Sequence, residues 1–356
     1  MRGKMLNRLQ SETYIKQIDE IGASGLNWDK LKDKTLVVSG ATGMIGCFLI
    51  DVIMRKNQKA NLHCHVVALG RNSAKAHDRL PYFDREDFSF KALNIASENL
   101  DLASRADYVI HLASTTHPRA YATDPIGTIQ VNVDGLKNML EYASNCDARL
   151  LFASSVEIYG ENRGDAEYFD EKYCGYVDCN TMRACYTESK RLCEAMCQAY
   201  IAQKHVDAVI ARVARAYGPT LLADDSKALS QFLHKALNGE DVVLKSAGQQ
   251  RYSYLYVADV VSGLLSILMK GRTGEAYNLA DKNSDTSLRD LASLVASSGH
   301  VKVVFELPDA VEAAGYSKAS LALMDGAKAQ RELGWKSHFD LEQGIRSTLS
   351  LLSELQ

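Results

Sequence analysis

The sequence has little proline, no long apolar run and no excess of charge of one sign. Only 5 of its 356 residues are proline, and hydrophobic residues (46%) and charged residues (24%) occur in globular proportions, which excludes collagen-like, low-complexity and disordered chains. No apolar run approaches the ~18–20 residues that a membrane-spanning helix needs. The 41 Lys and Arg nearly balance the 44 Asp and Glu, so the chain lacks the broad basic field of a nucleic-acid binder. We therefore expect no membrane and no nucleic acid among the partners of this protein.

Nothing in the sequence predicts a secretory signal or a metal site. The first twenty residues are polar and lack the apolar segment of a signal peptide, which favours a cytoplasmic location. The 8 cysteines are too sparse in a chain of this length for the disulfide framework of a small secreted domain. Cys193 and Cys197 can share one face of a helix, but no second pair of ligands completes a zinc site. We expect reduced, mostly buried thiols and no bound metal.

Short, continuous apolar runs alternate with helix-like stretches from Lys34 onward. Strands covered by helices on both faces have such runs, whereas half-exposed strands alternate apolar and polar residues. Right-handed crossovers between parallel strands then produce a doubly wound sheet. The sequence therefore predicts an α/β fold with a doubly wound, Rossmann-like parallel sheet. The expected strands are residues 36–38, 65–69, 108–112, 150–153 and 209–211, and the expected first helix of the sheet is residues 44–54.

We expect three regions along the chain. Residues 1–33 precede the first strand and have the pattern of an added N-terminal helical extension. Residues 34–212 contain the strand–helix alternation and form the expected dinucleotide-binding domain. Residues 213–356 are expected to form mainly a smaller C-terminal substrate-binding domain, with segments near 252–280 returning to the dinucleotide-binding domain. The expected elements of this last region are a helix at 228–237, a strand at 242–244 and a helix-rich stretch from 286 to the end.

The segment GATGMIG follows a predicted strand and opens a predicted helix. Its three glycines permit a tight turn, a close approach of the backbone to a pyrophosphate, and close packing of the helix on the strand. The first N–H groups of the helix then face the phosphates with the positive end of the helix dipole. A plain glycine turn is the alternative, but the strand before and the helix after favour a dinucleotide site. The expected cofactor contacts in this loop are Gly40, Thr42, Gly43, Met44, Ile45 and Gly46.

The residues after the second strand bear on which dinucleotide binds. A carboxylate at this place would accept a hydrogen bond from the ribose 2′-hydroxyl of NAD, but the strand ends in Leu69, Gly70 and Arg71. An arginine can instead pair with the 2′-phosphate of NADP. The sequence thus predicts NAD or NADP as the cofactor, with Arg71 favouring NADP unless it is a solvated loop residue.

Tyr186 and Lys190 are four residues apart on a predicted helix, so they share one face of that helix. A nearby ammonium group stabilises a tyrosinate, so we expect Lys190 to lower the pKa of the Tyr186 phenol. The phenolate can then remove a hydroxyl proton as a hydride leaves for the nicotinamide. Ser155 and Glu157 follow the strand at 150–153, and the carboxyl ends of parallel strands line the ligand crevice. We expect Ser155 to bridge the substrate hydroxyl and Tyr186, and Glu157 to act as a general acid or base, although a turn hydroxyl and a solvated carboxylate are the simpler alternatives.

These motifs together resemble the extended short-chain dehydrogenases/reductases that modify nucleotide sugars, within the NAD-dependent epimerase/dehydratase family. The resemblance covers nearly the whole chain from about Leu36 to Leu351, and it is closest to the UDP-glucuronate decarboxylases, through residues 118–125, 183–186 and 190–200. The segments that carry the wider resemblance are GATGMIG, HLAS at 111–114, VNVDG at 131–135, SSVEIYG at 154–160, YTESK at 186–190, residues 212–219, RYSYLYVAD at 251–259, GEAYNLA at 274–280 and ELGW at 332–335.

The resemblance implies an enzyme that oxidises a nucleotide sugar at C4 with a bound dinucleotide, as the first step of decarboxylation, epimerisation or dehydration. It implies that Ser155 and Tyr186 handle the C4 hydroxyl, that Lys190 holds the cofactor ribose and that Glu157 lies near the sugar ring. It also implies a homodimer through helices near 125–146 and 186–203. The further expected cofactor contacts are Arg71, Asn94, Ile95, Leu112, Ala113, Ser114, Lys190 and Val213. The expected substrate contacts are Ser155, His117, Tyr121, Arg215 and Arg251, the last resembling the arginine that meets the diphosphate or acts near the reacting sugar.

Three positions depart from the pattern of the family. Val156 stands where the decarboxylases carry serine and the dehydratases carry aspartate, and a valine cannot donate a proton. Arg215 replaces an asparagine of the substrate loop and adds a positive charge there, and Gly70-Arg71 replaces the acidic residue typical of bound NAD. Val156 and Arg71 favour an alternative, a net NADPH-dependent reductase of a keto-sugar. A non-catalytic dinucleotide-binding module is a second alternative, which would not require Tyr186 and Lys190.

Overall fold

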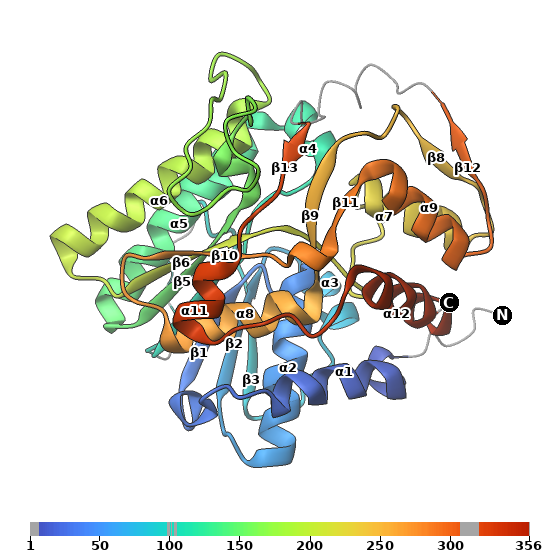
Figure 1. Ribbon diagram of the computed structural model, residues 1–356. Helices are drawn as coiled ribbons and strands as arrows, with labels where there is room; N and C mark the ends of the chain where they lie inside the picture. Colours follow the sequence, from blue (N-terminus) through green and yellow to red (C-terminus); the bar gives the residue numbers. More distant parts are fainter. Residues whose placement is uncertain (1–6, 98–99, 101, 103–104, 307–319, 356) are drawn as a thin grey trace.

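The computed structural model describes residues 7–97, 100, 102, 105–306 and 320–355. Its centre is a parallel sheet of seven strands in the order β3-β2-β1-β4-β5-β6-β10 (Figure 1). The order reverses between β1 and β4, where Ser39 pairs with Leu69 on one side and with His111 on the other. This confirms the predicted doubly wound α/β sheet. The strands are β1 (Thr35–Ser39), β2 (His65–Gly70), β3 (Phe88–Ala92), β4 (Tyr108–His111), β5 (Arg149–Ser155), β6 (Ala208–Val213) and β10 (Ala276–Leu279).

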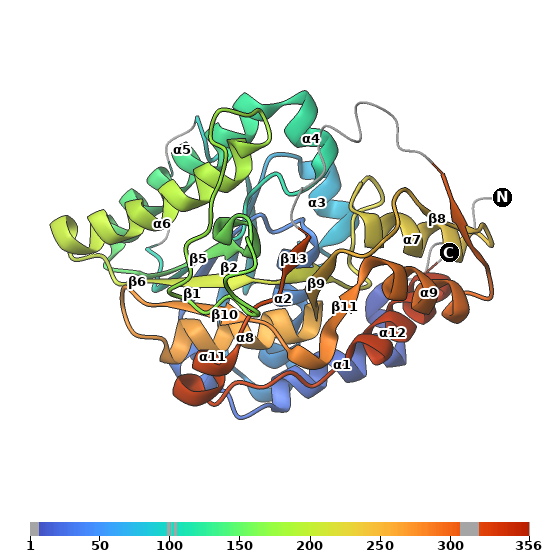
Figure 2. The same ribbon diagram turned by 45° about the horizontal axis from the view of Figure 1, so that its top comes forward.

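Successive side chains of these strands enter two different cores, because neighbouring residues of a strand point to opposite faces of the sheet. Val38 and Ala68 pack in the core beneath α2 (Met44–Ala60) and α8 (Val257–Lys270). Val37 and Leu69 pack in the core beneath α5 (Pro125–Cys146) and α6 (Ala184–Lys204). Figure 2 shows α5 and α6 lying side by side on one face of the sheet and α8 on the other. The continuous apolar runs of the sequence therefore arise, as predicted, because helices cover both faces of these strands.

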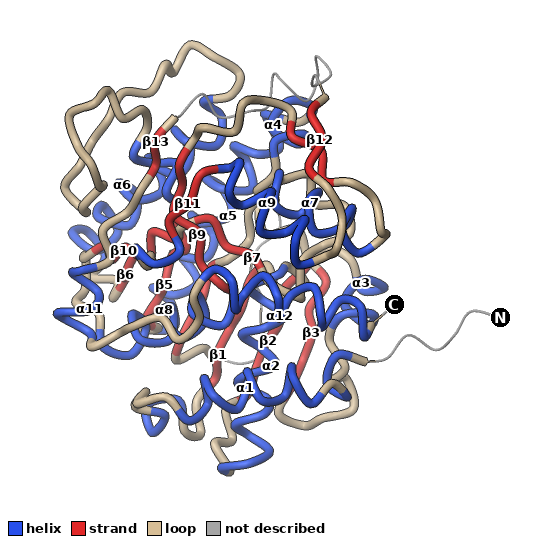
Figure 3. The backbone as a smooth tube through the Cα atoms, turned by 45° about the vertical axis from the view of Figure 1, so that its right-hand side comes forward, coloured by secondary structure: helices blue, strands red, loops and turns tan. Residues whose placement is uncertain are grey.

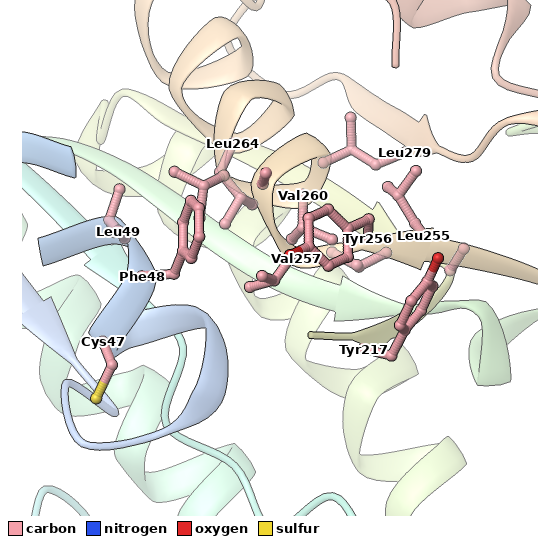
Figure 4. Close-up of a cluster of buried hydrophobic side chains, with 14 of the residues drawn as sticks. Cys47, Phe48, Leu49, Tyr217, Leu255, Tyr256, Val257, Val260, Leu264 and Leu279 are labelled. Atoms are coloured by element: carbon pink, nitrogen blue, oxygen red, sulfur yellow. The ribbon is translucent and has the colours of Figure 1, made fainter. Parts of the chain in front are cut away.

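The larger of the two cores joins the dinucleotide loop to the C-terminal half of the chain. Phe48 of α2 faces Val260 and Leu264 of α8, and all three side chains are fully buried (Figure 4). Tyr217 and Leu279 extend the same cluster towards β7 (Arg215–Tyr217) and β10. The helix that follows the glycine loop is thereby held against elements more than two hundred residues later in the chain.

The N-terminal extension packs on the outside of α2 and α8. It comprises η1 (Arg8–Gln10), α1 (Glu12–Ala23) and η2 (Trp28–Leu31). Asp51 of α2 is fully buried and accepts hydrogen bonds from Arg8 at 2.7 and 2.9 Å and from the Tyr14 hydroxyl at 2.6 Å. Because a buried carboxylate is costly unless it is paired, these contacts fix the extension to α2. Residues 1–6 of the predicted extension lie outside the described residues.

The C-terminal half builds a second, smaller region beside the sheet (Figure 3). In it β9 lies between β11 and β13 and also pairs with β7, while β8 and β12 form a separate parallel pair. The chain returns to the large sheet through α8 and β10, which pairs with β6. The elements of this region are α7 (Ala228–Leu237), β8 (Val242–Leu244), β9 (Arg251–Tyr256), η4 (Lys282–Ser284), β11 (Asp285–Ser287), α9 (Leu288–Ser298), β12 (Val303–Phe305), β13 (Leu321–Ala322), α11 (Ala327–Leu333) and α12 (Leu341–Glu354). Residues 307–319 of the predicted helix-rich end lie outside the described residues.

The remaining short elements connect the strands of the large sheet. They are α3 (Ser73–Arg79), α4 (Pro118–Thr123) and η3 (Val156–Tyr159). Over the part of the chain that is described, the structure holds no helix that is both long and apolar enough to cross a membrane. Each of the 8 cysteines is a free thiol, five of them buried, as the sequence predicts.

Candidate active site

The reversal of strand order brings the loops after β1 and β4 into contact. Gly40 has φ +70°, and a Cβ atom placed on it would lie 2.8 Å from the backbone nitrogen of Ala113. A Cβ atom on Gly46 would lie 2.4 Å from the carbonyl oxygen of Gly40. Only glycine fits at either place, the first for its backbone angle and its neighbour, the second for the close packing of helix on loop. Ligands of doubly wound sheets bind at such a reversal point.

The first turn of α2 leaves its backbone N–H groups without a capping side chain, since the residue before the helix is Gly43. A helix start of this kind offers free donors and the positive end of the helix dipole to a pyrophosphate. Thr42 lies beside Gly70 at the end of β2, so the loop and the second strand share one rim. The residues present therefore fit the phosphates of a dinucleotide.

The candidate adenosine contacts lie along the neighbouring strand ends. Arg71 is exposed directly after β2. Asn94 is half-buried after β3, and its side-chain oxygen accepts a 3.2 Å hydrogen bond from the backbone of Ala96. Ile95 is buried against Gly135 of α5, so its side chain packs in the core, and its carbonyl accepts a 2.8 Å hydrogen bond from the side chain of Asn138.

The other predicted cofactor residues lie at the same edge of the sheet. Leu112 and Ala113 follow β4 directly, and Val213 ends β6 with its side chain buried. Met44 and Ile45 are the first residues of α2. The carbonyl group of Met44 accepts a 2.8 Å hydrogen bond from Thr220, which ties the glycine loop to the second region.

Tyr186 lies on the first turn of α6 and is buried next to two strand-end hydroxyls. Its phenol lies near the hydroxyls of Ser155, at the end of β5, and Ser114, after β4, and both hydroxyls act to lower the pKa of the phenol. Its ring lies 4.9 Å, centroid to centroid, from that of Tyr121. Burial raises the pKa of Tyr186 to about 12, while the two serines and the nearby Arg183 act in the opposite direction. The fold therefore brings Tyr186 and Ser155 together, as predicted. The expected net lowering of the phenol pKa is wrong, because desolvation is the largest effect on it and raises it.

Lys190 lies one turn later on the same face of α6. Its ammonium group donates a 2.9 Å hydrogen bond to the carbonyl of Ala153, and it lies 4.7 Å from the ring centre of Phe152. The distance from this nitrogen to the ring centre of Tyr186 is 5.9 Å. Burial lowers the pKa of Lys190 to about 8. The ammonium group thus lies at the end of β5, between the predicted base and the sheet.

A hydrogen-bonded relay, which the sequence did not predict, supports this pair. Ser114 donates a 2.6 Å hydrogen bond to the side-chain oxygen of Asn132, whose amide donates a 2.8 Å hydrogen bond to Ser189. Asn132 belongs to α5 and is buried, so it joins β4, α5 and α6. Its place in the VNVDG segment is the only sequence signal that could have indicated this role.

Glu157 is held between two arginines. Its carboxylate lies 2.8 Å from Arg183 of the α6 start and 3.4 Å from Arg215 of β7. Both arginines also lie on aromatic rings, Arg183 at 4.7 Å from the centre of Tyr121 and Arg215 at 3.8 Å from the centre of Tyr252. The sequence analysis expects Glu157 to act as a general acid or base, and that role stays a prediction; the structure shows its carboxylate paired with two guanidinium groups.

Arg183 and Tyr252 are site residues that the sequence analysis did not single out. Arg183 precedes Tyr186 by three residues, a helical spacing that could have indicated a shared face. Tyr252 faces Arg215, whereas its neighbour Arg251 is exposed on the other face of β9 with Asp285 and Arg289. The structure therefore does not bring Arg251 to Tyr186.

His117 lies at the entrance to α4, at the edge of the site. Its ring nitrogen is 3.3 Å from the hydroxyl of Ser226, which links the loop after β4 to the second region. The structure thus places Tyr121 beside Tyr186, Arg215 beside Glu157, and His117 at the border of the site. Within the described residues, no group of three or more His, Cys, Asp and Glu side chains is arranged to hold a metal ion.

Comparison with known proteins adds independent information about this site. Residues 36–280 match the sequence model of the NAD dependent epimerase/dehydratase family. This chain belongs to that family. The match includes the glycine loop, Ser155, Tyr186 and Lys190, and it confirms the prediction of an NAD-dependent enzyme of the extended short-chain dehydrogenase/reductase type.

Several members of the NAD dependent epimerase/dehydratase family are similar over most of their length. UDP-glucuronic acid decarboxylase 1 of Danio rerio is 31% identical over 90% of this chain and 73% of its own. UDP-glucuronic acid decarboxylase 3 of Arabidopsis thaliana is 30% identical over 87% of this chain and 86% of its own. The structure of UDP-glucuronic acid 4-epimerase from Bacillus cereus, solved with UDP-glucuronic acid and NAD, has a TM-score of 0.77 at 20% identity and covers 90% of this chain and 100% of its own. These likenesses confirm the predicted family and fold.

Proposed function

We propose that this enzyme oxidises the C4 hydroxyl of a nucleotide sugar with a bound nicotinamide dinucleotide. The observation that carries the proposal is the placement of buried Tyr186 and Lys190 on one face of α6, near Ser155 at the end of β5, at the same sheet edge as the glycine loop. The decarboxylase and epimerase names of the relatives support this choice of substrate class.

The residues divide the chemistry between them. Ser155 orients the sugar hydroxyl, and Tyr186, as the phenolate, takes its proton as the C4–H bond breaks. A nicotinamide dinucleotide bound at this edge of the sheet would supply the acceptor for the hydride from C4, and the hydride for the reduction that closes the cycle. Ser155, Ser114 and Arg183 favour the phenolate against the effect of burial. Lys190, on the same face of α6 as Tyr186, would hold the ribose of the dinucleotide.

The C4 ketone is the common starting point of several outcomes. It acidifies the neighbouring C–H bond, which permits epimerisation or dehydration, and it weakens the bond to a carboxylate two carbons away, which permits decarboxylation. Val156, buried between Ser155 and Glu157, has no proton to give, and this favours the second candidate, a net reduction of a keto-sugar by NADPH. Arg71, exposed at the end of β2, supports NADP in the same way.

We propose further that two copies of the chain associate through α5 and α6. Ile126 and Ile129 of α5 and Leu192 of α6 are exposed large apolar side chains, on helices that pack side by side. Such side chains favour burial against a second copy. The 8 cysteines, too sparse in 356 residues for a disulfide framework, support a reducing compartment such as the cytoplasm.

The substitution Tyr186→Phe tests the proposed function. It removes the hydroxyl that takes the proton, so turnover should fall by at least about 100-fold. Dinucleotide affinity should change little, because the glycine loop is untouched. Mass spectrometry of nucleotide-sugar products and calorimetric titration of NAD and NADP measure the two effects. Tyr176→Phe, at an exposed tyrosine, is the control, and normal turnover by the Tyr186 variant would exclude the proposed chemistry.

A further inference from the structure

Residues 218–227 connect β7 to α7 through turns and loop. We call residues 220–227 the strap, because both of its ends contact segments at the carboxyl edge of the large sheet. In its middle, Ala223 and Asp224 are exposed, and the carbonyl of Leu222 accepts a 3.1 Å hydrogen bond from the backbone of Asp225. The strap is thus attached to the rest of the protein at two places, with a local turn between them.

The first end of the strap is fixed beside the glycine loop. The hydroxyl of Thr220 donates a 2.8 Å hydrogen bond to the carbonyl of Met44, the first residue of α2. The carbonyl of Thr220 accepts a 2.5 Å hydrogen bond from Arg79 at the end of α3. Thr220 and Leu221 are both buried. Short hydrogen bonds and burial make this end a firm attachment, which we call the anchor.

The second end of the strap meets the loop after β4 through longer contacts. The hydroxyl of Ser226 lies 3.3 Å from Nδ1 of His117 and accepts a 3.4 Å hydrogen bond from the backbone N–H of Arg119. The ammonium group of Lys227 donates a 3.4 Å hydrogen bond to the hydroxyl of Thr116. These distances exceed the usual range of hydrogen bonds, and Ser226 is only half-buried. This end, which we call the latch, is therefore the weaker attachment.

The anchor and the latch lie on the two sides of the reversal point of the sheet. The anchor is at the first turn of α2, which follows β1, and the latch is at the loop that follows β4. The phosphates of a dinucleotide fit the first turn of α2, and the loop after β4 begins near Ser114 and the phenol of Tyr186. A dinucleotide that extends from the glycine loop to Tyr186 therefore has the anchor beside its phosphates and the latch beside its nicotinamide end.

We infer that the strap is a gate for the exchange of the dinucleotide, which opens at the latch and turns about the anchor. The inference goes beyond the proposed sugar chemistry, but it rests on the proposed dinucleotide site. The contacts at both ends join groups of the protein, so the strap can close with or without a bound cofactor. The dinucleotide then has to wait for the strap to open both when it enters and when it leaves. A gate of this kind slows association and dissociation by the same factor and leaves the affinity unchanged.

The substitution Ser226→Ala tests the gate in the full-length protein. It removes the hydroxyl that holds the latch, so the association and dissociation rate constants of NADH and NADPH should both rise, by about fivefold. The dissociation constant is their ratio and should change by less than about twofold. Stopped-flow measurement of nicotinamide fluorescence gives both rate constants. Ser350→Ala removes an exposed hydroxyl of α12 and is the matched control, with rate constants equal to those of the wild type.

Hydrogen exchange of the protein without added dinucleotide gives a second readout. In Ser226→Ala the strap spends more time open, so the amides of residues 221–227 should exchange faster than in the wild type. The amides of β1 should exchange as in the wild type, which also shows that the variant is folded. Mass spectrometry of peptides after exchange measures both segments.

Two outcomes would overturn the gate. One is a pair of rate constants that Ser226→Ala leaves unchanged. The other is faster dissociation alone, with a larger dissociation constant, because this result would mean that Ser226 binds the dinucleotide directly. Failure of the proposed function is a different result: a wild type that binds neither NADH nor NADPH would refute the dinucleotide site and the gate together.

Discussion

His111 occupies the reversal point of the sheet as a neutral side chain. It is 1% exposed, and its ring nitrogen lies 2.8 Å from the hydroxyl of Ser39 on the neighbouring strand. Burial, with the charge of Lys190 as a smaller contribution, lowers the pKa of His111 to about 3. Below about pH 6.5 the His111 side chain of the unfolded chain binds a proton, whereas that of the folded protein stays neutral. Lowering the pH therefore destabilises the folded state.

We therefore expect the free energy of unfolding to fall as the pH is lowered from about 6.5 towards 3, by up to about 1.4 kcal/mol per pH unit from this residue. Urea titrations at several pH values measure the slope. His111→Gln keeps a polar partner for Ser39 but has no titrating group, so its slope should be smaller in this range. His205→Gln, at the C-terminal end of α6, is the control. Equal slopes for wild type and His111→Gln would refute the assignment.

For single residues, the sequence predicted the candidate catalytic side chains better than it predicted the partners that these side chains contact. Ser155, Tyr186 and Lys190 could be predicted because their spacing on a helix and at a strand end is local. The ion pairs of Glu157 depend on residues 26 and 58 positions away, and no local pattern reports such distances. Arg251 stays a predicted substrate contact; only the register of β9 decides that Tyr252, and not Arg251, faces Arg215.

Among the elements, the junction of β1 and α2 has the least freedom to change. Gly46 lies in the first turn of α2, and a Cβ atom there would meet backbone atoms of Gly40 and Ala41 at 2.4 to 2.9 Å. Backbone cannot move aside as a flexible side chain can, so the loop itself must shift.

We expect Gly46→Ala to destabilise the protein by about 1–3 kcal/mol and to weaken dinucleotide binding more than tenfold, because the shifted loop no longer fits a pyrophosphate. Thermal unfolding and titration with NAD and NADP measure the two effects. Gly25→Ala, where a Cβ atom meets nothing within 4 Å, should be close to the wild type in both. Unchanged affinity in Gly46→Ala would place the dinucleotide elsewhere.

The elements that the sequence predicted are those buried on both faces. The predicted strands at 65–69 and 209–211 lie within β2 and β6, and the predicted helix at 228–237 matches α7. The sequence pattern did not predict β3, whose residues Phe88–Ala92 are mostly exposed and alternate Phe, Ser, Phe and Lys, as suits the edge of the sheet. A continuous apolar run cannot reveal a strand of that kind.

For the whole molecule, the exposed apolar residues of α5 and α6 lead to a prediction about assembly. Ile129 and Leu192 are 44% and 51% exposed in the single chain. If α5 and α6 form the interface between two copies, Ile129→Glu and Leu192→Glu together should convert a dimer into a monomer, because buried like charges oppose association.

Light scattering after gel filtration measures the mass of each form. Phe305→Glu, at a 60% exposed residue of the second region, should leave the dimer intact. A wild type that is monomeric at micromolar concentration, or a double variant that stays dimeric, would contradict the proposed interface. The sequence alone could name these helices only through family resemblance, since one chain does not show which of its surfaces meets a second copy.

The return of β10 to the large sheet has a consequence for synthesis of the protein. β6 ends at Val213 and its partner β10 begins at Ala276, so more than sixty residues are added before that edge is paired. At about 5–20 residues per second, a nascent chain on the ribosome carries the open, apolar edge of β6 for several seconds. An unpaired edge strand is a template for aggregation. Chaperones that shield this edge should therefore raise the yield of the folded protein.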